Sequence, residues 1–243
     1  MTLPATPLEA RCRRLLVEPG LCKPDDALIT GLIAGGIVRH CGRVLAGDQA
    51  LVNKVCPCRA KGDCGLARAV HRNSAEYAWL MAASHVVPAS VPRLYGRSDR
   101  EGGFTMEFIE GERVYLWKAA LLASAPDRNE AALVGAVMGQ IHAASAQPGF
   151  DATPFRNHDD FHAIRLEPYL AFVANQHPPL ANRLYGLADR HYRADRVLLH
   201  GDVSLKSILF RGNVPVILDA ECATMGDASF DVAFCLNHLI LKA

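Results

Sequence analysis

The chain has 243 residues and 50% of them are hydrophobic, which is enough to bury a large core and to form two lobes. The formal net charge is +1 and 7% of residues are aromatic, which argues against a broad nucleic-acid-binding surface. No apolar run reaches the ~18 residues of a membrane span, and the start lacks the apolar core of a signal peptide. We therefore expect a cytoplasmic protein that binds neither membrane nor nucleic acid.

The N-terminal part begins with short elements. Residues 28–36 have the spacing of a short amphipathic helix, with Pro24 suited to its first turn and the pair Gly35 and Gly36 at its end. Residues 37–46 and 49–55 are short apolar stretches separated by a polar break. This pattern predicts two antiparallel strands joined by a hairpin turn.

Eight cysteines are present, and the absence of an export signal predicts reduced thiols. Cys56, Cys58 and Cys64 form a cluster, and His71 could supply a fourth zinc ligand. A zinc site typically uses two pairs at Cys-x2–4-Cys spacing, whereas this pair has Cys-x-Cys spacing and no second pair nearby. We favour plain thiols in a loop or strand over a metal site.

Residues 66–84 have helical periodicity, with Leu66, Val70, Tyr77, Leu80 and Met81 roughly on one face and Glu76 beside that stripe. Residues 91–96 and 102–111 are typical of two strands. Three helices are then predicted over 130–146, 159–175 and 179–195, the second interrupted at Pro168. Strands thus dominate the first 110 residues and helices the rest, with a boundary near Glu110 and Gly111.

Three acidic side chains follow two apolar runs near the C-terminus. Asp202 ends the run 197–202, and a predicted hairpin over 207–218 leads to Asp219 and Glu221. Asp219 and Glu221 share a face in extended chain, and the hairpin returns the chain toward Asp202. Carboxylates gathered in this way repel each other unless a cation is present, and a few oxygen ligands suit magnesium. The alternative is a set of surface acids at strand ends.

The runs around these acids, HGDVSLKS and LDAECATMGDASFDVAF, resemble the catalytic and metal-binding segments of the aminoglycoside phosphotransferase/choline kinase-like family. The resemblance covers most of the chain and is weaker in the first 60 residues. It implies an α+β, bilobal protein-kinase-like fold, with a nucleotide-binding N-lobe over 1–110 and a helical C-lobe over 111–243. It also implies ATP and Mg²⁺ as cofactors and a small-molecule hydroxyl as the phosphate acceptor.

The resemblance assigns roles to individual residues. Asp202 matches the catalytic aspartate, and His200 braces its loop. Asp219 and Glu221 match metal-binding carboxylates, while Lys54 matches the lysine on the nucleotide phosphates. The remaining nucleotide-site residues are Glu76 as the partner of Lys54, Gly35 and Gly36 in the phosphate-covering turn, Met106 behind the adenine pocket, and the Glu107 C=O and Ile109 N–H at the adenine edge. Lys206 contacts a phosphate or solvent, and we expect His142 and His238 to be structural.

Ser207 stands where the family usually has asparagine as a magnesium ligand. Three interpretations follow. In the first, the metal shifts to Asp219 and Glu221 and Ser207 reaches it through a water; this resembles the methylthioribose kinase branch, which has serine at this place and Asp-x-Glu downstream. In the second, the site binds nucleotide but transfers phosphate poorly. In the third, the site is inactive. We favour the first because Glu221 compensates for the missing asparagine.

Two further departures from the family pattern leave function open. The turn residues Arg39 and His40 either contact phosphate or block it. The chain ends soon after Leu236, Leu239 and Ile240, an apolar patch that predicts a homodimer or a partner over the C-terminal helix.

The alternative function is therefore a catalytically impaired or inactive nucleotide- or metabolite-binding module. A metal-dependent hydrolase lacks the usual histidine cluster. The acceptor stays open among aminoglycosides, choline, methylthioribose, homoserine, sugars and amino alcohols.

Overall fold

A computed structural model describes residues 7–23, 29–32, 41–46, 49–55, 64–123 and 128–241 of the chain. Its helices are α1 (Pro7–Val17), α2 (Cys64–Val86), α3 (Trp117–Leu122), α4 (Arg128–Ser145), α5 (His158–Phe161), the π-helical segment η3 (His162–Ala171), α6 (Phe172–Gln176), α7 (Ala181–Tyr192) and α8 (Ser229–Ile240). Its strands are β1 (Ile29–Leu32), β2 (Cys41–Ala46), β3 (Gln49–Val55), β4 (Leu94–Ser98), β5 (Gly103–Glu107), β6 (Val114–Leu116), β7 (Val197–Leu199), β8 (Ile208–Arg211), β9 (Val214–Ile217) and β10 (Thr224–Gly226).

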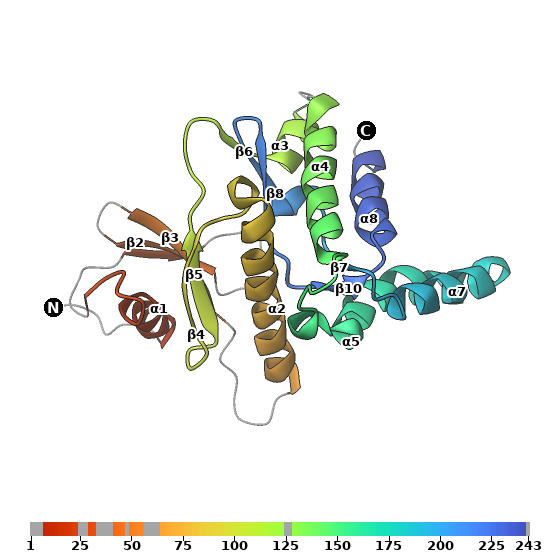
Figure 1. Ribbon diagram of the computed structural model, residues 1–243, viewed down its shortest axis with the longest axis horizontal. Coiled ribbons are helices and arrows are strands. Elements are labelled where there is room, and N and C mark those ends of the chain that lie inside the picture. The colour runs from red at the N-terminus through yellow and green to blue at the C-terminus, as the bar shows by residue number, and fades with distance from the viewer. Residues whose placement is uncertain are drawn as a thin grey trace.

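The N-terminal part is built on an antiparallel sheet with the strand order β1-β2-β3-β5-β4 (Figure 1). The predicted hairpin is confirmed: β2 and β3 pair from Cys41↔Lys54 to Ala46↔Gln49. The strands predicted over 91–96 and 102–111 are β4 and β5, and β5 ends earlier than expected, at Glu107. Together with the helices that follow, this sheet makes the chain α+β.

The helix predicted over residues 28–36 is wrong where the structure describes it. Ile29–Leu32 is strand β1, paired with Leu45 to Gly42 of β2. A helix of fewer than about 12 residues is marginal without tertiary support. Here the neighbouring strand offers a full ladder of backbone hydrogen bonds, so the segment extends the sheet instead. Residues 33–36 lie outside the described residues.

Strand β3 separates its side chains between two environments. Leu51 and Val55 pack with helix α1, a helix that the sequence pattern did not predict, and Asn53 Nδ2 donates to the Cys12 carbonyl of α1 at 3.1 Å. Val52 belongs to the main core on the opposite face. Because side chains alternate along a strand, Lys54 lies on the same face as Val52, toward α2 and the C-terminal part.

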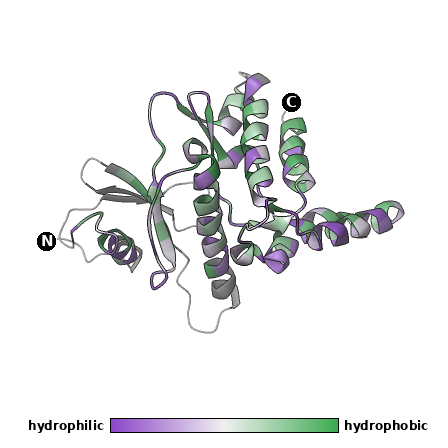
Figure 2. Ribbon diagram, in the orientation of Figure 1, coloured by the Kyte–Doolittle hydropathy of each residue, from purple (hydrophilic) through white to green (hydrophobic). Residues whose placement is uncertain are grey.

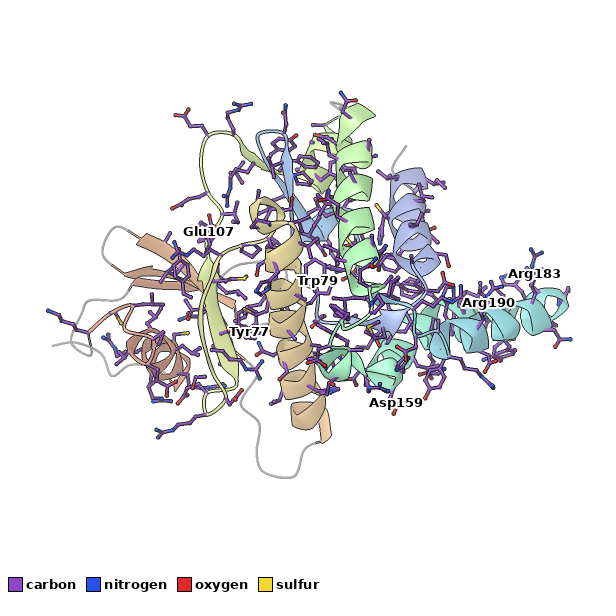
Figure 3. The ribbon with its side chains drawn as sticks, in the orientation of Figure 1. Tyr77, Trp79, Glu107, Asp159, Arg183 and Arg190 are labelled. Carbon is purple, nitrogen blue, oxygen red and sulfur yellow. The ribbon has the colours of Figure 1, made fainter. Side chains whose placement is uncertain are left out.

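The long helix predicted over 66–84 is confirmed as α2, but its predicted apolar face is only partly correct. Val70 and Met81 are each 38% exposed, whereas Glu76 is buried together with Trp79. The helix lies between the sheet and the C-terminal part (Figure 1), so it buries two sides rather than one stripe. Figure 3 shows Tyr77 on its sheet side and Trp79 on its other side, in edge contact with His200 at 4.9 Å between ring centroids.

The C-terminal part contains the three predicted helical regions and the predicted hairpin, as α4, the run α5–η3–α6, helix α7, and strands β8 and β9. The interruption expected at Pro168 takes the form of the π-helical segment η3. Two features were not predicted: β6 extends the hairpin to a three-stranded sheet, and β10 pairs with β7.

One hydrophobic core joins the two parts, since Val52, Phe104 and Trp79 belong to the same cluster as Val203 and Ile208. At the C-terminal end, α8 is strongly apolar (Figure 2). Its Leu236 and Ile240 are 51% and 75% exposed, while Leu239 packs against the core. In the part of the chain that the structure describes, no helix is both long and apolar enough to cross a membrane.

Candidate active site

The loop after β7 carries His200, Gly201 and Asp202. Gly201 has a φ of +75°, and a Cβ at this position would lie 2.5 Å from the carbonyl oxygen of Cys222. Only glycine accepts this backbone conformation without strain and leaves room for the neighbouring chain. The glycine therefore allows the loop to turn sharply and lie directly against the segment that carries Glu221.

Asp231 of α8 holds this loop in place. Its Oδ2 accepts a hydrogen bond from the His200 N–H and its Oδ1 accepts one from the Gly201 N–H, both at 2.9 Å. His142 of α4 contacts Oδ2 at 3.1 Å, which agrees with its expected structural role. A buried carboxylate that receives two backbone N–H groups rigidifies the loop, because charge-assisted hydrogen bonds are the strong ones.

The His200 imidazole is a second brace, as the resemblance implied. Its Nδ1 accepts a hydrogen bond from the Asp202 N–H at 3.1 Å, so Nε2 carries the proton that is donated to the Leu218 carbonyl at 3.0 Å. This tautomer follows from the hydrogen-bond network. The ring is fully buried, and burial lowers the pKa of His200 against the opposing charges of Asp231 and Asp202.

The buried His200 should make the protein less stable in mild acid. Its pKa is lowered in the folded state, so the unfolded chain takes up this proton first as the pH falls below about 6.5. Stability supplied by the neutral ring is present above that pH and is lost below it, at up to about 1.4 kcal/mol per pH unit. Urea unfolding at pH 7.5 and 5.5 should show a smaller difference for His200→Gln than for the wild type.

The exposed His177 provides the control for that measurement. His177→Gln should leave the wild-type pH dependence unchanged. An equal pH dependence in His200→Gln and wild type would show that His200 is not the group responsible.

Asp202 is almost completely buried, at 2% exposure. Its Oδ2 lies 3.0 Å from Nη2 of Arg165 and 3.5 Å from Nζ of Lys206. Lys206 therefore faces the candidate catalytic aspartate, and its expected contact with a phosphate stays a prediction. Arg165, which comes from η3, was not identified from the sequence.

Lys54 connects the N-terminal sheet to the acidic segment. Its Nζ lies 2.6 Å from Oε1 of Glu76 and 2.7 Å from Oδ1 of Asp219. The structure thus brings together three residues that the sequence placed in one site. Burial alone would lower the pKa of the Lys54 ammonium, but the charges of Glu76 and Asp219 raise it instead. Lys54 is therefore positively charged at neutral pH.

The two carboxylates around Lys54 have pKa values that shift in opposite directions. Burial raises the pKa of Glu76 to about 7 against the attraction of Lys54. Burial also acts to raise the pKa of Asp219, but the charge and hydrogen bond of Lys54 outweigh it and lower that pKa. Asp219 is therefore the acid that stays ionised, as a metal ligand must be.

Asp219 and Glu221 are the candidate magnesium ligands. Asp219 has a φ of +71°, a left-handed conformation that is uncommon outside glycine and concentrates at functional sites. Burial, together with the charge of Asp219, raises the pKa of Glu221, so a cation between them would relieve a repulsion. Within the described ranges, no group of three or more His, Cys, Asp or Glu could hold a metal by itself. Two carboxylates fit magnesium shared with phosphate oxygens.

Ser207 is buried in the turn before β8. Its Oγ contacts Oγ of Ser204 at 3.1 Å, and its carbonyl accepts a hydrogen bond from the Leu218 N–H at 2.8 Å. The backbone contact fixes Ser207 beside the residue that precedes Asp219. The hydroxyl is held by another serine, so a direct role as a metal ligand stays a prediction.

The predicted hinge follows β5. Met106 is buried in the main core and pairs with Val52 of β3. The Glu107 carboxylate is bound by Arg211 at 2.6 Å, which ties the end of β5 (Figure 3) to the β8–β9 hairpin. The N–H of Ile109 donates to no described residue, so it is available for the adenine contact that the resemblance implies.

Several predicted positions lie outside the described residues: Gly35, Gly36, Arg39, His40, Cys56 and Cys58. Cys64 begins α2. Cys222 is a buried free cysteine and Cys235 is a partly buried one.

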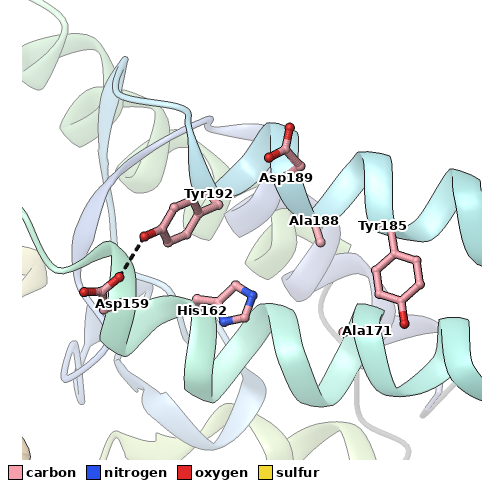
Figure 4. A pocket seen from close by; sticks show the side chains of 7 residues that line it. All are labelled: Asp159, His162, Ala171, Tyr185, Ala188, Asp189 and Tyr192. Carbon is pink, nitrogen blue, oxygen red and sulfur yellow. Dashed lines mark hydrogen bonds between the residues drawn. The ribbon is translucent and has the colours of Figure 1, made fainter.

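A separate groove opens between η3 and α7, with a volume of about 530 Å³ (Figure 4). It is lined by Asp159, His162, Ala171, Tyr185, Ala188, Asp189 and Tyr192, and the Tyr192 hydroxyl donates to Asp159 across it at 2.7 Å. It contains no residue that the sequence assigned to the site.

Comparisons with known proteins bear on the family and the fold of this chain. A sequence model described as "Phosphotransferase enzyme family" matches residues 43–242. A comparison with curated proteins gave no significant match.

Solved structures show the same fold. Choline kinase LicA from Streptococcus pneumoniae has a TM-score of 0.61 and 14% identity, over 98% of this chain and 77% of that chain. A choline/ethanolamine kinase family protein from Mesorhizobium loti has a TM-score of 0.58 and 20% identity, over 97% of this chain and 71% of that chain. The streptomycin–ATP–APH(2")-IIa ternary complex has a TM-score of 0.52 and 16% identity, over 95% of this chain and 76% of that chain. The expected α+β, bilobal kinase-like fold is confirmed.

Proposed function

We propose that this chain, which belongs to the phosphotransferase enzyme family, transfers the terminal phosphoryl group of ATP to a hydroxyl group of a small molecule. The observation that carries the proposal is the ion chain Glu76–Lys54–Asp219, with Nζ of Lys54 within 2.7 Å of both carboxylates. It places a fixed cation beside a candidate metal ligand, which is the arrangement that phosphoryl transfer requires.

The chain's own residues would divide the work as follows. Lys54 binds phosphate oxygens, and Glu76 keeps its ammonium in place. Asp219 and Glu221 would hold magnesium, which when bound compensates the negative charge of the phosphates. Asp202 accepts a hydrogen bond from the acceptor hydroxyl and so orients the attacking oxygen. As that oxygen attacks the phosphoryl group, Asp202 receives the hydroxyl proton.

The acceptor belongs to a broad class in this proposal: an aminoglycoside, choline, a sugar or an amino alcohol. Structural likeness below 25% identity supports the fold and not the acceptor. The alternative is a catalytically impaired nucleotide-binding module. The Ser207 hydroxyl, which stands where the family usually has an asparagine and contacts Oγ of Ser204 at 3.1 Å, favours that alternative.

Calorimetric titration of the protein with ATP, with and without magnesium, tests the donor half of the proposal. We expect binding that magnesium strengthens, followed by ADP release on addition of one acceptor from a panel of these hydroxyl compounds. Binding without transfer to any acceptor would support the alternative. No nucleotide binding by folded protein would contradict both functions.

Ser207 allows a sharper test of the metal site. If Asp219 and Glu221 supply the native ligands, Glu221→Ala should remove most of the magnesium dependence, and Ser207→Asn should leave the rate unchanged or lower it. A loss of about 10²-fold is expected for Glu221→Ala, because one charge-stabilising contact is worth roughly 3 kcal/mol. Magnesium titrations of the steady-state rate measure both. A rate increase in Ser207→Asn would show that the serine is a defective asparagine.

A further inference from the structure

Arg165 reaches the catalytic loop from a helix 36 residues earlier in the chain. Its Nε donates to the Gly201 carbonyl at 2.6 Å. Its Nη2 lies 3.0 Å from Oδ2 of Asp202, as an ion pair without hydrogen-bond alignment. The side chain is 5% exposed and its guanidinium lies over the Phe234 ring of α8, 5.4 Å from the centroid. A planar group held on three sides has little freedom to move.

The π-helical segment explains how Arg165 acquires this orientation. In an α-helix the Ile164 carbonyl would accept a hydrogen bond from residue 168, but Pro168 has no N–H. Nη1 of Arg165 donates to this same carbonyl at 3.1 Å. π-Helical turns are rare and frequent at functional sites. Pro168 thus excludes the α-helical hydrogen bond to this carbonyl, and Arg165 contacts the carbonyl through Nη1 while its other nitrogens contact the catalytic loop.

The ion pair distinguishes the two oxygens of Asp202. Oδ2 is buried and faces Arg165 and Lys206. In the described part of the chain, the ion-pair contacts with Arg165 and Lys206 are both made at Oδ2, and no hydrogen bond reaches Oδ1. A carboxylate held through one oxygen presents the other in a defined direction, and an acceptor hydroxyl needs such a direction for in-line attack.

We propose that Arg165 is a positioning residue that fixes Asp202 through Oδ2 and Gly201 through its carbonyl, so that Oδ1 faces the acceptor hydroxyl. This inference rests on the proposed phosphotransferase function. Arg165 does not touch nucleotide or acceptor in this arrangement. Lys206 differs from it, because its side chain is 42% exposed and can leave Asp202 without disturbing the loop.

The first test is steady-state kinetics of Arg165→Lys and Arg165→Met against wild type. We expect kcat to fall about 100-fold in Arg165→Met, the size expected when a reacting group is misplaced by about 1 Å. The KM for ATP should stay within about twofold. Arg165→Lys keeps the charge but not the planar fork, so it should recover only part of kcat. Arg193→Met, at an exposed salt bridge on α7, is the matched control and should match wild type.

Pro168→Ala separates positioning from folding, in case Arg165→Met does not fold. Alanine restores a backbone donor to Ile164 and permits the α-helical register, so the thermal midpoint should stay or rise. The changed register should reorient Arg165 and lower kcat several-fold. Lower kcat at unchanged or higher thermal stability is the result that a purely structural role does not produce.

The outcomes also separate this inference from the proposed function. If wild type transfers phosphate and both Arg165→Lys and Pro168→Ala keep full kcat, the positioning role is wrong and the phosphotransferase function stands. If Arg165→Met raises the KM for ATP without lowering kcat, Arg165 acts on nucleotide binding and the inference is overturned. If wild type binds ATP but transfers to no acceptor, both proposals fail.

Discussion

Replacing Asp219 with asparagine should lower phosphoryl transfer by about 10³-fold and remove the magnesium dependence of ATP binding. The substitution takes away the charge that pairs with Lys54 at 2.7 Å and that would bind the metal. It keeps the shape of the side chain. Asparagine also tolerates the left-handed φ of +71°, so the backbone at this position should not change.

The choice of asparagine matters because alanine would add backbone strain at a positive φ. Calorimetry with ATP at several magnesium concentrations gives the binding result, and the rate of ADP release gives the catalytic one. Asp99→Asn, at an exposed salt bridge with Arg97 between β4 and β5, is the control and should match wild type. Unchanged magnesium dependence in Asp219→Asn would place the metal elsewhere.

The same substitution tests whether Lys54 depends on both of its partners. With Asp219 neutral, Lys54 keeps Glu76 at 2.6 Å as its remaining buried carboxylate. The charge of Asp219 contributes to the raised pKa of Glu76, after burial. Its removal should therefore lower the pKa of Glu76 and strengthen the remaining pair. We expect the fold to survive while the affinity of the site for magnesium is lost.

The path of the chain from Asp202 to Asp219 could be predicted from sequence because it is local: one hairpin, β8–β9, returns the chain from the Asp202 loop to Asp219. The extended chain expected for Asp219 and Glu221 is wrong, because β9 ends at Ile217 and Asp219 has a left-handed φ of +71°. The pairing of Lys54 with Glu76 is less local, but an alternating strand followed by a long helix predicts it once the resemblance supplies the roles. The structure confirms the contact at 2.6 Å.

The errors in the N-terminal part have a different origin. Residues 29–32 become a strand because β2 lies beside them, and nothing within the segment indicates this partner. The predicted apolar stripe of α2 passes through Val70 and Met81, which are both exposed. Helical spacing puts Glu76 beside that stripe, yet its side chain is buried because Lys54 compensates its charge.

Arg165 could not be found from sequence because its function depends on an irregular helix. A regular α-helix over 159–175 gives no reason to aim this side chain at Gly201. Pro168 was the one available signal: it predicted an interruption, but not that the segment would continue as a π-helix. Asp231 was visible only as part of the motif, and its contacts with the His200 and Gly201 N–H groups needed the fold.

Asp202→Asn should lower kcat by about 10²- to 10⁴-fold, the usual contribution of a positioned acid–base group. ATP binding should be nearly unchanged, because Lys54, Asp219 and Glu221 remain. The cost in folding stability should be about 3 kcal/mol, at the low end for removing one partner of a buried ion pair. Arg165 loses its ion pair with Asp202 but keeps hydrogen bonds to the Gly201 and Ile164 carbonyls, so it is not left without partners.

This separation of binding from turnover distinguishes Asp202 from Asp219. Calorimetry with ATP and magnesium, ADP release with the acceptor, and urea unfolding should be measured on the same preparation. Asp189→Asn, at an exposed salt bridge on α7, controls for the loss of a negative charge. Because Asp202 is the one residue proposed to receive the hydroxyl proton, full turnover in Asp202→Asn would mean that the acceptor is oriented by another group. A mechanism in which Asp202 accepts that proton would then be wrong, even if nucleotide binding were intact.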